Sequence, residues 1–205
     1  MGGAINTNST LGSSNFDGTI QSTVKANTSA GFSIVTVTSD GTSFTAGHGL
    51  GVSPDVIIQK QRNASADWYV YHKNIGATET VKLNKTDAKS SSSDFGNTSP
   101  TSTVFTSNTT GVSGRQIIAY CLSEVASYSK FGSYKGNGNS DGTFVFTGFR
   151  PAWIMTKRID GGSQNWLIHD IKRDPYNVAN KKLAPNLNSE ENNSSTIGNS
   201  TNDTI

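Results

Sequence analysis

The alternation of apolar and polar positions along this chain predicts short β-strands. The clearest example is Phe32-Ser33-Ile34-Val35-Thr36-Val37-Thr38, in which β-branched residues fill most positions. Similar runs occur at residues 19–24, 56–58, 67–72, 78–83 and 104–105, and the most apolar run spans residues 115–125. No window offers sustained apolar residues at helical spacing. The pattern therefore predicts an all-β protein.

One strand pattern occurs twice, about 97 residues apart. Val56-Ile57-Ile58 follows a proline and precedes a strand led by Trp68. Trp153-Ile154-Met155 follows another proline and precedes a strand led by Trp166. Repetition at a fixed spacing indicates one structural unit used twice. We therefore predict two related β-sandwich-like units.

This repeat divides the chain into four predicted segments. They are a polar N-terminal segment with one strand (1–30), a first β unit (31–126), a second, truncated β unit (127–188) and a polar tail (189–205). The counterparts of the closing strands of the first unit would fall beyond the last residue, so the second unit is expected to have an open sheet edge. The strand at residues 19–24, a neighbouring subunit or a continuation of a longer chain could complete it.

Turn signals place the strands within each unit. Asp40-Gly41 predicts a hairpin after the first long strand. The second unit is expected to open at residues 128–134, to turn at Asp141-Gly142 and to continue as a strand through Phe144-Val145-Phe146.

Composition agrees with the strand pattern and weakens several classes of function. Apolar residues make up 33% and charged residues 16%, while Ser, Thr, Asn and Gly, which suit strands and turns, are abundant. The net charge is +2 and the basic residues are scattered, so we expect no nucleic-acid partner. No run of 18 apolar residues predicts a membrane-spanning helix, and the N-terminus lacks the pattern of a signal peptide. The lone Cys121 in an apolar run predicts a buried thiol.

The polar candidates for chemistry each have a structural interpretation that we prefer. His48 lies between glycines without the spacing of a phosphate loop, so it predicts a turn or bulge. The stretch Asn137–Gly142 resembles half of a calcium loop, but it lacks two carboxylates that hold the ion. His72 and His169 end the two repeated Trp-led strands and are interpreted as equivalent structural positions. Glu190-Glu191 fall in the polar tail, where they are expected to be solvated. We therefore expect no catalytic residues, no metal site and no cofactor.

Aromatic side chains are the remaining candidates for ligand binding. Their flat apolar faces can stack on sugar rings. Alternation places Tyr69 and Tyr71 on the face opposite Trp68, which we expect to pack in the core. We predict ligand contacts from Tyr69, Tyr71, Trp153 and Tyr176.

Several motifs resemble an uncharacterised domain of virion-associated proteins in marine tailed phages. The motifs are Gly31-Phe32-Ser33-Ile34-Val35, Gly47-His48-Gly49-Leu50-Gly51-Val52-Ser53-Pro54, Trp68-Tyr69-Val70-Tyr71-His72, Tyr128-Ser129-Lys130-Phe131-Gly132-Ser133-Tyr134, Gly148-Phe149-Arg150-Pro151-Ala152-Trp153 and Lys172-Arg173-Asp174-Pro175-Tyr176-Asn177. The similarity covers residues 19–188. Such domains often stand beside concanavalin-like, LamG-type modules in fibre or appendage proteins.

This resemblance implies a non-catalytic structural or host-adhesion module of a tail fibre or appendage, located in the virion after assembly in the host cytoplasm. It implies other virion proteins and host surface glycans as partners, and a homo-oligomer, commonly a trimer. A carbohydrate-binding module of a larger cell-surface or secreted protein stays open as an alternative. So does a glycan depolymerase, which would need carboxylates converging in a groove.

Overall fold

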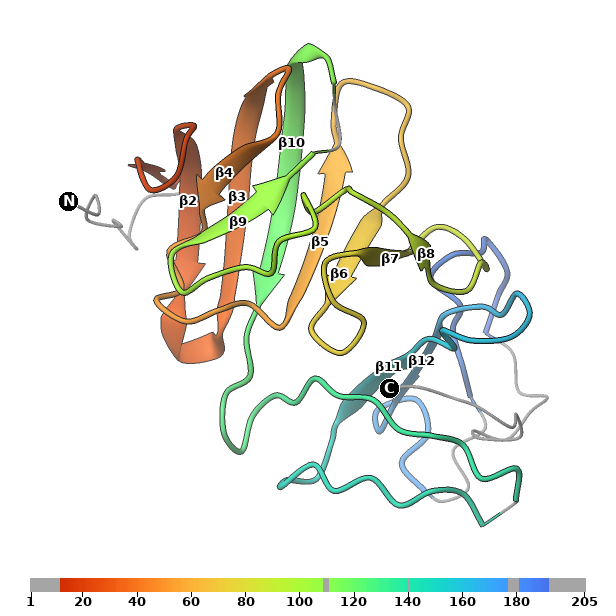
Figure 1. The fold of residues 1–205 in the computed structure, drawn as a ribbon. Coiled ribbons are helices and arrows are strands. Elements are labelled where there is room, and N and C mark those ends of the chain that lie inside the picture. The colour runs from red at the N-terminus through yellow and green to blue at the C-terminus, as the bar shows by residue number, and fades with distance from the viewer. Residues whose placement is uncertain (1–11, 109–110, 140, 177–180, 192–205) are drawn as a thin grey trace. The chain divides into compact units, whose positions relative to one another are not determined.

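A computed structural model describes residues 12–108, 111–139, 141–176 and 181–191 (Figure 1). The protein is all-β, as the sequence pattern predicts. The strands are β1 (Ser13–Asn15), β2 (Ser22–Asn27), β3 (Phe32–Asp40), β4 (Phe44–Gly47), β5 (Val56–Gln61), β6 (Tyr69–His72), β7 (Glu79–Lys82), β8 (Ser90–Ser91), β9 (Val104–Ser107), β10 (Ser113–Leu122), β11 (Trp153–Thr156) and β12 (Leu167–Asp170), with one 3-10 turn, η1 (Thr28–Ala30). Within the described ranges, no α-helix accompanies them.

The chain divides into two compact units. The first combines residues 12–80 with Ser90–Phe131, and the second combines Val81–Lys89 with the chain from Gly132 onward. β1 and β2, from the polar N-terminal segment, belong to the first unit because β2 pairs with β3. The stretch Val81–Lys89 belongs to the second unit, because side chains of that unit donate hydrogen bonds to the backbone carbonyl groups of this stretch.

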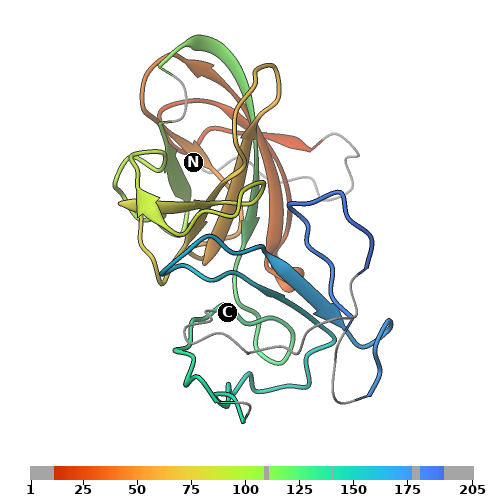
Figure 2. The same cartoon turned by 90° about the vertical axis from the view of Figure 1, so that its right-hand side faces the viewer.

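The first unit consists of a large sheet covered on one face by a small one. The large sheet has the strand order β1-β2-β3-β10-β5-β6-β7-β8, and the small sheet pairs β4 with β9. The β4–β9 pair crosses in front of the large sheet in Figure 1. β10 is central: it pairs antiparallel with β3 on one side and with β5 on the other, and β3 and β10 run side by side in Figures 1 and 2.

The core lies between these two sheets. Alternate residues of β10, namely Ile117, Ala119 and Cys121, point inward and are almost fully buried. Phe44 on β4 and Phe105 on β9 close the core from the other layer, at 2% and 1% exposed. Burying each large apolar side chain contributes about 1.5–3 kcal/mol, so the core between the sheets is a main source of stability.

Gln59 is a fully buried polar side chain that connects the two layers. From β5 its Oε1 accepts a hydrogen bond from the Ser107 hydroxyl on β9 at 3.0 Å. Its Nε2 donates to the carbonyl oxygen of Asp94 at 3.3 Å. A buried amide is costly unless it is hydrogen-bonded, so the bond to Ser107 fixes the small sheet against the large one and the bond to Asp94 holds the loop between β8 and β9.

Two predictions about local structure are wrong. Asp40-Gly41 forms a turn, but β3 and β4 do not pair as a hairpin because the chain crosses here from the large sheet to the small one. Asp40 accepts hydrogen bonds from the backbone and hydroxyl of Thr42, and these stabilise the turn whichever strand follows. The segment Phe144-Val145-Phe146 is not a strand, because no other strand pairs with it within the described residues.

The two segments that share the sequence pattern both form antiparallel strand pairs. β5 pairs with β6 inside the large sheet of the first unit. β11 pairs with β12 in a two-stranded sheet of the second unit, and Ile168 of β12 also bridges to Leu183. The surroundings of the two pairs differ, and an internal repeat stays a prediction.

Candidate functional site

The outer face of the large sheet, which points away from the core, carries a continuous apolar surface. It comes from residues that alternate with the buried ones: Ile34 of β3 lies opposite Tyr120 of β10, which lies opposite Ile58 of β5. Two residues further along the same strands, Phe32 of β3 lies opposite Leu122 of β10. All five are partly exposed, so solvent reaches this surface.

Three aromatic side chains form a row across this surface. The rings of Phe32 and Tyr120 have centroids 6.4 Å apart and planes 10° apart. The rings of Trp68 and Tyr120 have centroids 6.4 Å apart and planes 17° apart. We call these three residues the aromatic row. Nearly parallel, partly exposed rings in a row offer apolar surface against which the C–H face of a sugar can pack.

The polar residues around the aromatic row are mainly basic or uncharged. Lys25 on β2 is exposed and lies opposite Ile34. Lys60 on β5 lies opposite Ile118, and its Nζ donates to the carbonyl oxygen of Gln61 at 2.8 Å. The outward positions of β2, β5, β6 and β10 hold no carboxylate, and the one at the outward positions of β3, Asp40, lies at the opposite end of that strand from Phe32.

Carboxylates gather instead at one end of the large sheet. Lys73 Nζ lies 3.0 Å from Asp55 and 2.8 Å from Glu124, and Lys130 pairs with Glu124 at 3.3 Å. Glu124 also accepts a hydrogen bond from the backbone N–H of Phe131. These paired groups hold together the loops that follow β6 and β10.

The four predicted ligand-binding residues belong to two different units and differ in exposure. Tyr71 is 4% exposed and packs against Phe95, while Tyr69 packs partly against the core. Alternation does put the two tyrosines on the face opposite Trp68, but it is the tyrosines that face the core and Trp68 that lies on the outer face, the reverse of the prediction. Tyr71 therefore has no free ring face for a ligand. Trp153 and Tyr176 are 55% and 81% exposed and belong to the second unit.

Sequence reasoning missed Phe32 and Tyr120 as candidates. Both stand at alternate positions of strands that the apolar pattern did identify. Only the register between β3 and β10 places them near each other, and register is not visible in one sequence.

His48 is a buried structural residue of the first unit. Its Nδ1 accepts a hydrogen bond from the backbone N–H of Leu50 at 3.3 Å, so its Nε2 donates to the carbonyl oxygen of Thr101 at 3.2 Å. Burial lowers the pKa of His48 and keeps the ring neutral. The ring connects two loops, in agreement with the predicted turn.

The other two histidines have different surroundings. His72 is partly exposed, and its Nδ1 accepts a hydrogen bond from the backbone N–H of Asn74 at 3.1 Å. His169 is 4% exposed, and neither ring nitrogen has a hydrogen-bond partner among the described residues. Burial lowers the pKa of both rings. The two positions therefore match in strand order but not in environment.

Lys157 is a buried cation that the sequence reasoning did not single out. It is 5% exposed, and its Nζ donates to the carbonyl oxygens of Thr86 at 2.8 Å and Gln164 at 2.6 Å. Burial lowers the pKa of Lys157 to about 8. Both acceptors are backbone groups of loops in the second unit, so the lysine holds those loops together.

Charged groups also anchor the chain after β12. Arg173 donates to Asp170 at 2.6 Å and to Glu191 at 3.2 Å. Glu191 was predicted to be a solvated charge in the tail. It is instead paired, because Asp170 orients the guanidinium so that a second edge faces Glu191. Residues 192–205 of the predicted tail lie outside the described part.

The loop that resembles a calcium site is held by its own hydrogen bonds. The side-chain oxygens of Asn137 and Asn139 accept bonds from the backbone N–H groups of Asn139 and Asp141. The Asn137 amide donates to the carbonyl oxygen of Asp141. These bonds hold the turns of the loop. Across the described residues, no group of three or more His, Cys, Asp or Glu side chains could hold a metal ion.

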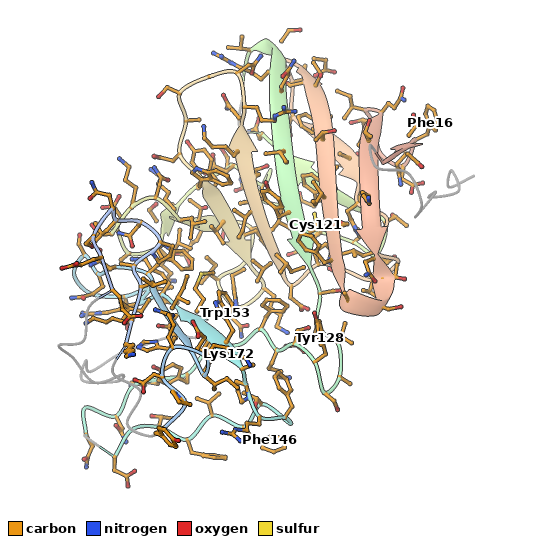
Figure 3. All side chains as sticks on the ribbon, turned by 180° about the vertical axis from the view of Figure 1, so that it is seen from behind. Phe16, Cys121, Tyr128, Phe146, Trp153 and Lys172 are labelled. Carbon is orange, nitrogen blue, oxygen red and sulfur yellow. The ribbon has the colours of Figure 1, made fainter. Side chains whose placement is uncertain are left out.

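Cys121 is fully buried on β10, as predicted, and burial raises its thiol pKa to about 12. In Figure 3 it lies within the large sheet. A thiol held protonated in the core is not a reactive nucleophile.

Comparison with known proteins adds the family. No helix among the described residues is long and apolar enough to cross a membrane. No curated protein and no solved structure shows significant similarity to the chain. One family does match, and its match spans residues 6–203. The chain therefore belongs to the family described as a domain of unknown function, DUF7483.

Proposed function

We propose that this protein is a non-catalytic structural and adhesion module of a phage virion, a component of a tail fibre or similar appendage that contacts host surface glycans. The observation that carries the adhesion role is the aromatic row. Phe32, Tyr120 and Trp68 place three nearly parallel, partly exposed rings on a rigid sheet. Rings fixed by strand packing lose little conformational entropy when a ligand stacks on them.

Two further points support a binding role over a catalytic one. Several described groups that could do acid–base chemistry have structural partners: His48 connects two loops, Glu124 pairs with Lys73, and Asp170 holds Arg173. The motifs that resemble virion-associated proteins of marine tailed phages support the location. In an appendage with several copies, weak contacts from each copy add up through avidity.

Binding to an array of immobilised neutral and acidic oligosaccharides tests the adhesion role. We expect Trp68→Ala to weaken binding by up to about tenfold, because one aromatic contact contributes about 0.5–1.5 kcal/mol. Trp153→Ala is the matched control, since Trp153 is exposed but lies outside the aromatic row. Equal losses from both variants would contradict the assignment of the ligand to this face.

The virion location needs a separate measurement. Mass spectrometry of purified particles from a phage that encodes this chain should detect it in stoichiometric amounts. Particles that contain the chain but bind no glycan through it would leave the structural role alone. The alternative function, a carbohydrate-binding module of a larger cell-surface or secreted protein, relies on the same aromatic row and predicts glycan binding without virion incorporation.

A further inference from the structure

A strand-forming segment of the second unit has no partner strand within the part of the chain that the structure describes. Thr143-Phe144-Val145-Phe146-Thr147 consists only of aromatic and β-branched residues, the types most common in strands. The backbone groups of Phe144, Val145 and Phe146 make no hydrogen bond within the described chain. Phe144 is 85% exposed and Phe146 is 78% exposed, and Figure 3 shows Phe146 on a coil segment. Two phenylalanines with so much exposed surface on one short segment are unusual for a lone chain.

The first unit contains a similar sequence whose strand is paired. Both sequences begin with Asp-Gly-Thr and end with Phe-Thr. In the first unit Asp40-Gly41-Thr42 leads into β4, where Phe44 is followed by a threonine. In the second unit Asp141-Gly142-Thr143 begins the stretch in which Phe146 is followed by a threonine. β4 pairs with β9, and Phe44 is 2% exposed. A comparable sequence therefore buries its phenylalanine once a second strand pairs with it.

Residues 143–147 read the same in both directions, so a second copy of the same segment is a suitable antiparallel partner strand. We propose that two copies of this chain pair through residues 143–147 as an antiparallel two-stranded ribbon around a two-fold axis. In the centred register Val145 faces Val145 of the other copy, Phe144 faces Phe146 and Thr143 faces Thr147. Aromatic pairs and threonine pairs are favourable cross-strand neighbours. A two-fold contact uses the same patch on both copies, and the palindrome makes each facing pair one of like residues.

Nothing in the segment opposes such pairing. Exposed edges are usually protected by lysine, proline or a bulge, and residues 143–147 contain no charge and no proline. The Thr143 hydroxyl donates to the carbonyl oxygen of Lys135, and the Thr147 hydroxyl donates to that of Phe149. These bonds anchor both ends of the segment while leaving the backbone between them available.

The expected affinity is low. A phenylalanine side chain can bury about 150–250 Å², so the exposed parts of Phe144 and Phe146 correspond to about 330 Å² per chain and about 650 Å² per pair. That area is below the range of stable specific complexes. We therefore expect a weak dimer with a dissociation constant of roughly micromolar or higher. Because a two-fold contact cannot build a trimer alone, in a trimeric appendage it would join neighbouring trimers.

Cysteine cross-linking tests the register. In the Val145→Cys variant the two new thiols face each other across the axis at about 4.5–5.5 Å between Cα atoms, within reach of a disulfide. We expect a disulfide-linked dimer under mild oxidation. Thr143→Cys is the matched control: its thiol faces Thr147 of the other copy, and the two thiols lie about 14 Å apart, so it should stay monomeric. The native Cys121 is buried and does not interfere.

Sedimentation velocity over a concentration series supplies a second readout. The wild-type chain should shift from monomer to dimer, and a Phe144→Ser, Phe146→Ser double variant should stay monomeric with an unchanged far-ultraviolet circular dichroism spectrum. Equal cross-linking of the two cysteine variants, a monomer at every concentration, or open-ended aggregates would overturn the proposal. If the double variant fails to fold, the cysteine variants still decide. The proposal does not depend on glycan binding, and its failure would leave that role standing.

Discussion

The buried hydrogen bond between Gln59 and Ser107 gives a prediction with an unusual sign. Gln59→Leu keeps the size of the side chain but removes the acceptor of the Ser107 hydroxyl, which is fully buried. The carbonyl oxygen of Asp94 keeps a hydrogen bond from the backbone of Asn108 at 2.8 Å, so the main cost comes from the hydroxyl. An unsatisfied buried polar group costs about 1–3 kcal/mol, and we expect the free energy of unfolding to fall by about 2 kcal/mol.

Ser107→Ala should cost a similar amount, because it leaves the Oε1 atom of Gln59 buried without a donor. The double variant removes both polar atoms and leaves two apolar side chains in contact. It should therefore be more stable than either single variant, although each single change is destabilising.

Urea unfolding followed by circular dichroism, with linear extrapolation to water, measures all four proteins. A double-mutant cycle then gives the coupling between the two residues. A double variant that loses the sum of the two single effects would refute the reasoning, because the two atoms would then contribute independently of each other.

Three further predictions concern titration, reactivity and packing. Burial holds the histidine pKa values below 6.5, so the unfolded chain binds more protons than the folded chain below that pH. The stability contributed by these histidines should be complete above pH 6.5 and fall as the pH drops below it. Equal urea midpoints at about pH 7.5 and about pH 5 would contradict this. Cys121 should resist iodoacetamide at about pH 8 in the folded protein and react in guanidinium chloride, as mass spectrometry would show; rapid labelling of the native protein would argue against a buried thiol. Gly47→Ala should destabilise by about 1–3 kcal/mol in thermal unfolding, because an added Cβ would collide with the buried Asn15, whereas Gly132→Ala, with open space around it, should be nearly neutral.

The strands of the first unit were readable from the sequence because their buried faces follow strict alternation. Val35 and Val37 of β3 and Ile117 of β10 stand at every second position, and each is in the core. The same pattern could not say which strands pair. Asp40-Gly41 gave an ordinary hairpin signal, yet the chain changes layers there, because the partners of β3 come from β2 and from the distant β10.

The aromatic positions show a second limit of the sequence. Alternation put Trp68 and Tyr71 on opposite faces, but it could not say which face is covered. The small sheet β4–β9 decides this, since it covers the face that carries Tyr71 and leaves the aromatic row on the other. Phe144 and Phe146 illustrate the converse: a strong strand propensity formed no strand where the described chain offers no second strand.

The central position of β10 has a consequence for how the protein is made. Phe32 and Leu122, which face each other across β3 and β10, are 90 positions apart in the chain. Until the ribosome releases β10, the β2–β3 pair and the β5–β6 pair are separate hairpins, because the strand that joins them in the sheet has not yet been made. Contacts between such distant residues make folding slow and leave strand edges open during synthesis. We therefore expect refolding to be limited by the insertion of β10, and nascent chains that stop before Ser113 to depend on chaperones.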